Sequence, residues 1–244
     1  MAHASSISFS TKPAAFYLAG DSTTAAQSDE GGGWGVGFLK TLQDGAVGTD
    51  MGYNGATTVS FVYGGAWANV IDAVNRSKEA FDPYVTIQFG HNDQKPAANI
   101  SIEQYSANLK NMALEAQAAG GTPILVTPLS RRNYNSSGLV TEDLADQRAA
   151  TIAVARSIEI DYIDLNGAST RYLDAIGSAD AATYNRVPGD FTHLNPSGSV
   201  VFGDMVSLLI TSTTKVRRAL SMYTRPNREV VMAIEKGVYI FPSS

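Results

Sequence analysis

The sequence predicts a three-layer α/β/α sandwich built on a parallel β-sheet. Short apolar runs, typical of strands that are buried on both faces, alternate along the chain with longer stretches that favour helices. No internal repeat and no linker rich in Pro, Gly or Ser divides the 244 residues, which indicates one large domain. In sheets of this kind ligands bind beyond the carboxyl ends of the strands, so polar residues at those ends are candidate site residues.

The apolar runs predict four strands. The first is AAFYLAG, residues 14–20, which ends in glycine. The others are YVTIQFG at 84–90, PILVTPL at 123–129 and IDYIDLN at 160–166. Helices are predicted at residues 66–77, 101–121, 142–158 and 196–212. Ser101 is the expected N-cap of the helix that it begins.

We assign residues 1–212 to the domain, with residues 1–13 as a flexible N-terminal tail. Residues 213–244 form a C-terminal extension that extends past the last predicted helix. It could add a helix and a strand, or it could form a contact between copies of the chain. The sequence does not decide between these roles, nor does it give the oligomeric state.

Composition excludes several classes of function. A net charge of −5 gives no basic field for nucleic acid or for an anionic membrane. The chain has no cysteine and three scattered histidines, so we expect no disulfide, no metal site and no cofactor. No apolar run approaches the roughly 18 residues of a membrane span, and the first residues lack the pattern of a signal peptide. Three N-x-S/T sequons, at Asn75, Asn99 and Asn135, are compatible with secretion, and we expect an extracellular protein.

The first strand leads directly into GDSTTA, residues 20–25. A serine in a turn after a buried strand has a hydroxyl at the expected ligand edge, which makes Ser22 a candidate nucleophile. Asp-Ser-Thr-Thr is also an ordinary set of turn and N-cap residues. The G-x-S-x-G pattern of many serine hydrolases is absent here.

The strand at 84–90 leads into FGHNDQKP, residues 89–96. The side-chain amide of Asn92 could donate to a developing oxyanion, which a carboxylate could not do. An Asx-turn that ends a strand before proline is the structural alternative. In YNGATTVSF, residues 53–61, Gly55 could expose its backbone N–H to a substrate, although Asn-Gly is also a common turn.

The stretch GDFTHLNPSG, residues 189–198, pairs an acid with an imidazole just before the last predicted helix. Asp190 could accept from the ring N–H of His193, which would fix the tautomer and leave the other nitrogen to act as a base on a serine. A surface histidine beside an acid is the alternative. His3 lies in the tail and His91 has its own neighbours, so a Ser–His mechanism would use His193 or His91.

These blocks resemble the SGNH (GDSL-like) hydrolase superfamily across roughly residues 14–212. The matching residues are Ser22 in GDST, Gly55 in NGATT, Asn92 in GHND and His193 in DFTH. The stretches LAGDST, QFGHNDQKP and GDFTHLNPSG resemble the rhamnogalacturonan acetylesterase branch in particular. The resemblance implies a flavodoxin-like α/β/α fold and removal of O-acetyl groups from a plant cell-wall polysaccharide.

The resemblance also implies a role for each residue. Ser22 would be the nucleophile, His193 the base and then the acid, and Asp190 its orienting partner. The backbone N–H groups of Ser22 and Gly55 and the amide of Asn92 would form the oxyanion hole. Three neighbours of these residues are further candidates for substrate binding: His91, Asp93 and Thr192.

Two departures from the family pattern leave other functions open. Ala56 and Thr57 follow the glycine, where this branch often has Arg-Ser, and the arginine would suit an acidic, uronate-containing substrate. Secreted members of the branch usually contain cysteines, and this chain has none. The alternatives are another ester (acetylxylan, a small aryl or alkyl ester, a lipid or a thioester) and a carbohydrate-binding domain without catalysis.

Overall fold

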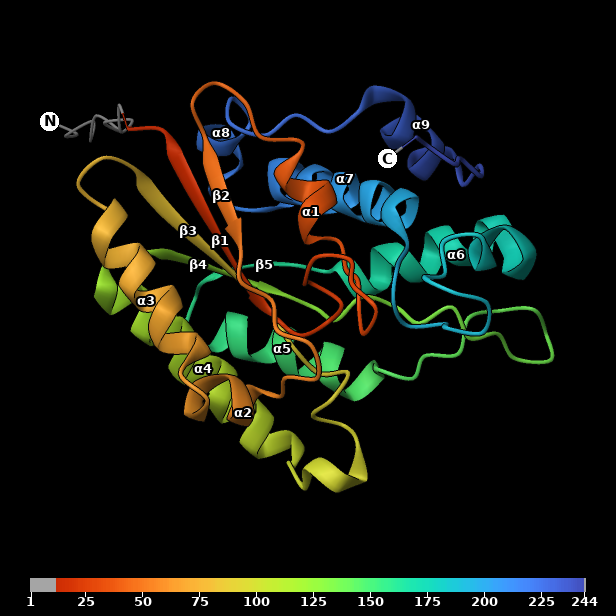
Figure 1. Ribbon diagram of the computed structural model, residues 1–244, viewed down its shortest axis with the longest axis horizontal. Coiled ribbons are helices and arrows are strands. Elements are labelled where there is room, and N and C mark those ends of the chain that lie inside the picture. The colour runs from red at the N-terminus through yellow and green to blue at the C-terminus, as the bar shows by residue number, and fades with distance from the viewer. Residues whose placement is uncertain (1–11, 244) are drawn as a thin grey trace, which may run out of the picture.

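A computed structural model describes residues 12–243 of the chain. Five parallel strands form one sheet in the order β2-β1-β3-β4-β5 (Figure 1). Their bounds are Ala14–Gly20 for β1, Val47–Asp50 for β2, Asp82–Gln88 for β3, Thr122–Val126 for β4 and Asp161–Ile163 for β5. This is the flavodoxin-like order, in which the connection reverses direction between β1 and β3.

Helices cover both faces of the sheet, which confirms the predicted α/β/α sandwich. The first face is covered by α1 (Gly35–Leu39), α6 (Leu165–Ala182) and α7 (Pro196–Thr213). The second is covered by α2 (Thr58–Tyr63), α3 (Ala66–Ser77), α4 (Ile102–Ala119) and α5 (Ala145–Ser157). A short 3₁₀ turn, η1 (Pro96–Ala98), follows β3.

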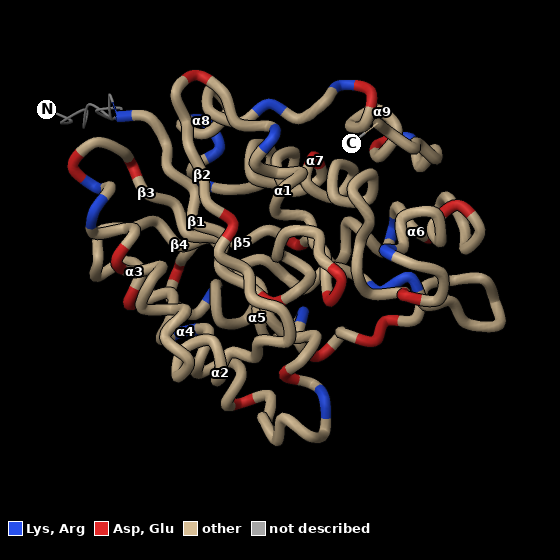
Figure 2. The backbone as a smooth tube through the Cα atoms, viewed as in Figure 1, with Lys and Arg blue, Asp and Glu red and all other residues tan. Residues whose placement is uncertain are grey.

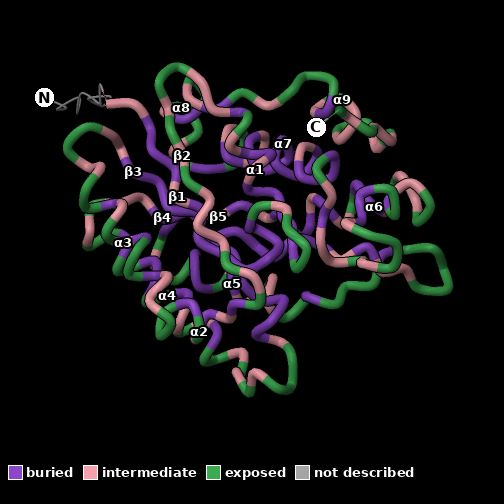
Figure 3. Tube along the Cα trace, in the orientation of Figure 1, coloured by how far each residue is buried: buried purple, intermediate pink, exposed green. Residues whose placement is uncertain are grey.

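Two hydrophobic cores flank the strands because successive side chains of a strand point to opposite faces. Phe16 and Leu18 of β1 pack with α1, α6 and α7, whereas Val85 and Ile87 of β3 pack with the helices of the second face. Figure 3 shows the buried residues concentrated along the strands and α7. The central strands are therefore largely apolar, which is why their sequences could be recognised as strands.

The predicted helices agree with α3, α4, α5 and α7 to within three residues at each end. Ser101 caps α4 as expected, since its side chain accepts from Gln104 N at 3.2 Å. The predicted strand at 84–90 is wrong by two residues at each end, because the parallel ladder with β1 closes at Gln88. Gly90 then turns the chain away with φ +132°.

The prediction for residues 160–166 is wrong in its second half. Asp164 accepts from Gly167 N at 3.1 Å, so it caps α6 and ends the strand after Ile163. The helix α6 itself was not predicted from the sequence. Gly177, with φ +78°, introduces a kink within it. The edge strand β2 was also missed, because VGTD is half-exposed and carries no apolar run.

The C-terminal extension packs on the domain as α8 (Arg217–Leu220), α9 (Arg228–Lys236) and a final segment that we call the strap, residues 237–243. The buried side chains of Leu220 and Val230 belong to the first-face core, so the extension completes that core. The strap forms no strand. Its carbonyl groups at Val238 and Ile240 accept from the buried hydroxyls of Tyr172 and Tyr184.

Most of the predicted N-terminal tail, residues 1–11, lies outside the described residues. Lys12 belongs to the fold, because its Nζ donates to the carbonyl of Lys78 at 2.7 Å. Along the described chain, Lys and Arg are interspersed with Asp and Glu (Figure 2). None of the helices described in the structure is long and apolar enough to cross a bilayer.

We expect Tyr184→Phe to lower the free energy of unfolding by about 1 kcal/mol, because the carbonyl of Ile240 loses its hydrogen-bond donor. Urea unfolding measures the change. Tyr63→Phe is the matched control, since the side chain of Tyr63 is 88% exposed. Equal stability of the two variants would show that the strap contributes nothing through this contact.

Candidate active site

Ser22 lies in the turn that follows β1, and a buried polar network fixes that turn. The carboxylate of Asp21 is fully buried and accepts from the backbone N–H and the hydroxyl of Thr23, at 2.8 and 2.7 Å. His91 Nδ1 lies 3.6 Å from the other oxygen. Burial raises the pKa of Asp21, but the contacts with His91 and Thr23 outweigh it and lower that pKa below its usual range. Gln88 of β3 donates to the Thr23 hydroxyl at 2.6 Å and ties the turn to the neighbouring strand.

The structure brings Ser22, His193 and Asp190 together. Ser22 Oγ lies 2.8 Å from His193 Nε2, and His193 Nδ1 lies 3.0 Å from Asp190 Oδ2. The tautomer with its proton on Nδ1 satisfies both contacts, because the ring then donates to the carboxylate and accepts from the hydroxyl. The loop before α7 therefore delivers an acid and a base to a serine 171 residues away in the chain.

Asp190 is held as an anion by four hydrogen bonds. Its Oδ1 accepts from the backbone N–H groups of His193 and Thr192, and its Oδ2 accepts from the His193 ring and from Arg186 Nε at 3.0 Å. Burial raises the pKa of Asp190, but these donors outweigh that effect and lower it to about 2. The carboxylate is thus ionised at neutral pH and can stabilise a positive charge on His193.

A buried arginine that the sequence analysis missed supports the same loop. Arg132 is 2% exposed, and its Nη2 donates to the carbonyls of His193 at 2.6 Å and Asp190 at 3.2 Å. Its Nε donates to Asn185 Oδ1 at 2.6 Å. Burial lowers the pKa of Arg132 to about 10, so the side chain still carries its charge at neutral pH. Arg132 follows β4 at the carboxyl edge of the sheet. The expectation that polar residues after strand ends belong to the site, which indicated Ser22 and Asn92, could therefore also have indicated Arg132.

The expected oxyanion donors also occur on neighbouring loops. Asn92 Nδ2 donates one proton to the Ala56 carbonyl at 3.0 Å, while Lys95 Nζ donates to Asn92 Oδ1 at 2.7 Å and fixes the orientation of the amide. Among residues 12–243, the backbone N–H groups of Ser22 and Gly55 have no acceptor. Gly55 has φ +75° and open space where a Cβ would lie, so no side chain hinders approach to its N–H.

The three further candidates lie beside the site and have internal partners. His91 is buried in the network beneath the serine turn, and it does not face open space. Asp93 is also buried, and its Oδ1 accepts from the backbone N–H and hydroxyl of Thr58. Thr192 is half-buried and its hydroxyl accepts from Arg131 Nη1 at 2.5 Å. This geometry favours a positioning role for the first two and leaves Thr192 at the edge of the site.

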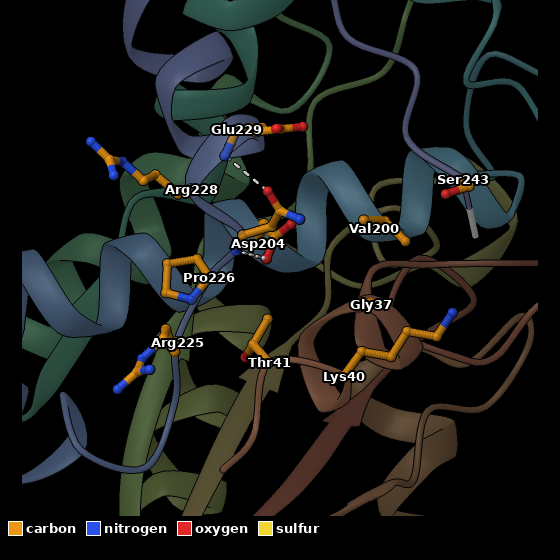
Figure 4. Close-up of a pocket in the computed structure, with 11 residues that line it drawn as sticks. Gly37, Lys40, Thr41, Val200, Asp204, Arg225, Pro226, Arg228, Glu229 and Ser243 are labelled. Carbon is orange, nitrogen blue, oxygen red and sulfur yellow. Dashed lines mark hydrogen bonds between the residues drawn. The ribbon is translucent and has the colours of Figure 1, made fainter.

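A cavity of about 250 Å³ opens beside the glycine block and is lined by Tyr53, Asn54, Gly55, Ala56, Ser60, Phe61, Gly64 and Ala66. A larger cavity of about 790 Å³ lies between α1, α7 and α9, and none of the candidate site residues lines it. Figure 4 shows that the charged groups of Lys40, Arg225 and Arg228 in that larger cavity point away from one another. Of the two cavities, only the smaller is lined by a residue of the expected oxyanion hole, Gly55, and Ser22 and His193 line neither.

A serine, an oriented histidine and a half-buried acid on an α/β/α sheet form the arrangement that serine hydrolases use. Residues 18–201 match the model of the GDSL-like Lipase/Acylhydrolase family. The match spans most of the chain and includes Ser22, Asp190 and His193. The chain belongs to this family of ester hydrolases.

Two curated proteins of Bacillus subtilis strain 168 are similar to the chain. Rhamnogalacturonan acetylesterase RhgT is 29% identical over 173 residues, which are 70% of this chain and 72% of that protein. The probable rhamnogalacturonan acetylesterase YesY is 28% identical over 200 residues, which are 78% of this chain and 89% of that protein.

Solved structures share the fold. The Bacillus subtilis protein YXIM superposes with a TM-score of 0.71 at 22% identity, over 82% of this chain, and the chain spans 56% of that protein. A catalytic variant of Axe2, an acetylxylan esterase from Geobacillus stearothermophilus, superposes with a TM-score of 0.61 at 19% identity, over 80% of this chain and 93% of that one.

The low pKa of Asp190 predicts a dependence of stability on pH. An aspartate whose pKa is about 2 in the folded protein and about 3.9 in the unfolded chain stabilises the fold above pH 3.9, by about 2 kcal/mol, and this stabilisation is lost as the pH falls toward 2. We therefore expect Asp190→Asn to be less stable than the wild type at pH 6, with a difference that shrinks at pH 3.

Urea unfolding at both pH values measures this effect. Asp72→Asn, on the exposed surface of α3, is the matched control and should show no such dependence. A difference between wild type and Asp190→Asn that stays constant from pH 6 to pH 3 would contradict the role given to ionised Asp190.

Proposed function

We propose that the protein is a serine esterase in which Ser22 is the nucleophile, His193 the general base and Asp190 the residue that orients His193. The observation that carries the proposal is the continuous hydrogen-bonded relay from Ser22 Oγ through the His193 ring to Asp190 Oδ2, with distances of 2.8 and 3.0 Å. A serine hydroxyl is a weak nucleophile until a positioned base can take its proton, and this geometry supplies that base.

The reaction proceeds in two acyl-transfer steps. Ser22 Oγ attacks the ester carbonyl while His193 Nε2 takes the hydroxyl proton, and the tetrahedral oxyanion is stabilised by the unpaired N–H groups of Ser22 and Gly55 and by the second amide proton of Asn92. His193 then gives its proton to the leaving alcohol and leaves an acyl-serine. A water molecule, activated by the same nitrogen, hydrolyses that intermediate.

For the substrate we propose the O-acetyl groups of a plant cell-wall polysaccharide, with acetylated rhamnogalacturonan first among them. The names of both curated relatives support this choice. Exposed aromatic rings, which suit the apolar faces of sugars, lie close to the site in sequence and space: Tyr53 is 66% exposed and lines the cavity beside Gly55, and Phe191 is 44% exposed two residues before His193. Because such a polymer lies outside the cell, the proposal includes an extracellular location.

We expect Ser22→Ala to abolish ester hydrolysis without unfolding the protein, because no other hydroxyl in the described structure contacts His193 Nε2. Acetate release from acetylated rhamnogalacturonan, acetylated xylan and a small aryl acetate measures activity, and a fluorophosphonate probe measures covalent labelling of Ser22. The exposed Ser212→Ala is the control. A variant Ser22→Ala that kept more than about a tenth of the wild-type rate would refute the assignment of the nucleophile, and a wild type without labelling would favour the binding domain.

We expect Asn92→Ala to lower kcat by about 10²- to 10³-fold, because one oxyanion donor is lost while the nucleophile and base remain. Steady-state kinetics on the aryl acetate measure the loss, and fluorophosphonate labelling should persist. A loss confined to KM would instead place Asn92 in ground-state binding.

A further inference from the structure

Arg131, the first of the two arginines after β4, is a half-buried cation without an acidic partner. No carboxylate oxygen of residues 12–243 lies within 4.0 Å of its guanidinium, whereas Arg148 and Arg186 each have one. Burial lowers the pKa of Arg131, as happens when a cation loses water without gaining a counter-ion in contact. The positive charge is thus only partly compensated within the protein.

The guanidinium of Arg131 lies between the two loops that bear the relay and the oxyanion amide. Its Nη1 donates to Thr192 Oγ1 at 2.5 Å and its Nη2 to the carbonyl of His91 at 3.4 Å. Thr192 immediately precedes His193, and His91 immediately precedes Asn92. Arg131 is therefore beside the reacting groups and not on a remote surface.

The contacts of Arg131 leave part of its hydrogen-bonding capacity free. A guanidinium has five N–H donors in one plane. Three neutral acceptors use some of them: the Thr192 hydroxyl, the His91 carbonyl and the Gln94 amide oxygen, at 3.2 Å when that amide is oriented to satisfy both of its ends. The Nε–H and one N–H of Nη1 remain for an anionic group, whereas both N–H groups of Nη2 already have acceptors.

We propose that Arg131 binds a carboxylate of the substrate, so that the enzyme selects acetylated polymers that contain uronic acid over neutral ones. The inference depends on the proposed function, in which Ser22 accepts the acyl group. The glycine block offers no cation at Ala56 and Thr57, and Arg131 supplies one from the loop after β4. The positive charge contacts Thr192 and His91, the residues that precede His193 and Asn92, so a uronate near the acetylated sugar would be recognised while the acetyl group reacts.

The test compares Arg131→Gln and Arg131→Lys with wild type on acetylated rhamnogalacturonan, acetylated xylan and a small aryl acetate. We expect Arg131→Gln to lower kcat/KM on the acidic polymer by about 10- to 100-fold, mainly through KM, because a hydrogen bond to a charged group is lost. The losses on the two neutral substrates should be much smaller. Arg131→Lys should keep part of the preference, since it retains the charge without the planar donors.

Two further measurements separate charge recognition from a structural role. Arg218→Gln removes an exposed arginine of α8 and should leave all three activities at the wild-type level. Raising the salt concentration should increase the wild-type KM for the acidic polymer and should not change that for xylan, because salt screens the attraction. This second measurement needs no variant, so it tests the inference even if Arg131→Gln fails to fold.

Equal losses on all three substrates would overturn the inference and would make Arg131 a link between two loops. A wild type that is active on both polymers without a preference for the acidic one, or with a KM that salt does not change, would overturn it as well. In these cases the loss of activity in Ser22→Ala would still support the proposed function. Acetate release from neither polymer would overturn both.

Discussion

The hydrogen bond between Ser22 Oγ and His193 Nε2 joins segments that lie 171 residues apart, and the site depends on both ends of it being held still. Neither partner lies within a regular element: Ser22 is in a turn and His193 in a loop. Each is therefore fixed by polar contacts that are specific to its own segment. An error of about 1 Å in either segment would separate the proton acceptor from the hydroxyl.

The two anchors use buried charge in different ways. Beneath the serine, Asp21 is fully buried: its Oδ1 accepts from the backbone N–H and hydroxyl of Thr23, while its Oδ2 accepts no hydrogen bond and lies 3.6 Å from His91 Nδ1. Beneath the histidine, Arg132 is buried against backbone carbonyls, with no carboxylate in contact within the described chain. A buried charge with a neutral shell is expensive, and its Nη1 has no partner in the structure. We infer that burying Arg132 lowers the stability of the fold but fixes the position of the loop that carries Asp190 and His193.

Much of this arrangement could be predicted from the sequence, because the residues involved follow strands that are largely apolar. AAFYLAG and YVTIQFG identify two neighbouring strands, and the serine and the amide follow them directly, so adjacency in the sheet places them together. The pairing of Asp190 with His193 followed from their spacing. The features that could not be predicted depend on single polar contacts. Examples are the capping of α6 by Asp164 and the hydrogen bond from Arg132 to Asn185 in another loop. Neither leaves a periodic signal, since each depends on where the chain returns in space.

The strap is attached in a way that bears on how the C-terminal sequence can change over time. The hydroxyls of Tyr172 and Tyr184 donate to main-chain carbonyls at positions 238 and 240, and every residue type offers the same carbonyl. Substitutions at those two positions thus leave both hydrogen bonds available. The hydrogen-bonding constraint falls on the tyrosines that donate, whereas Tyr239, Ile240 and Phe241 of the strap are constrained by the packing of their side chains on the first-face core and on the ring of Tyr184.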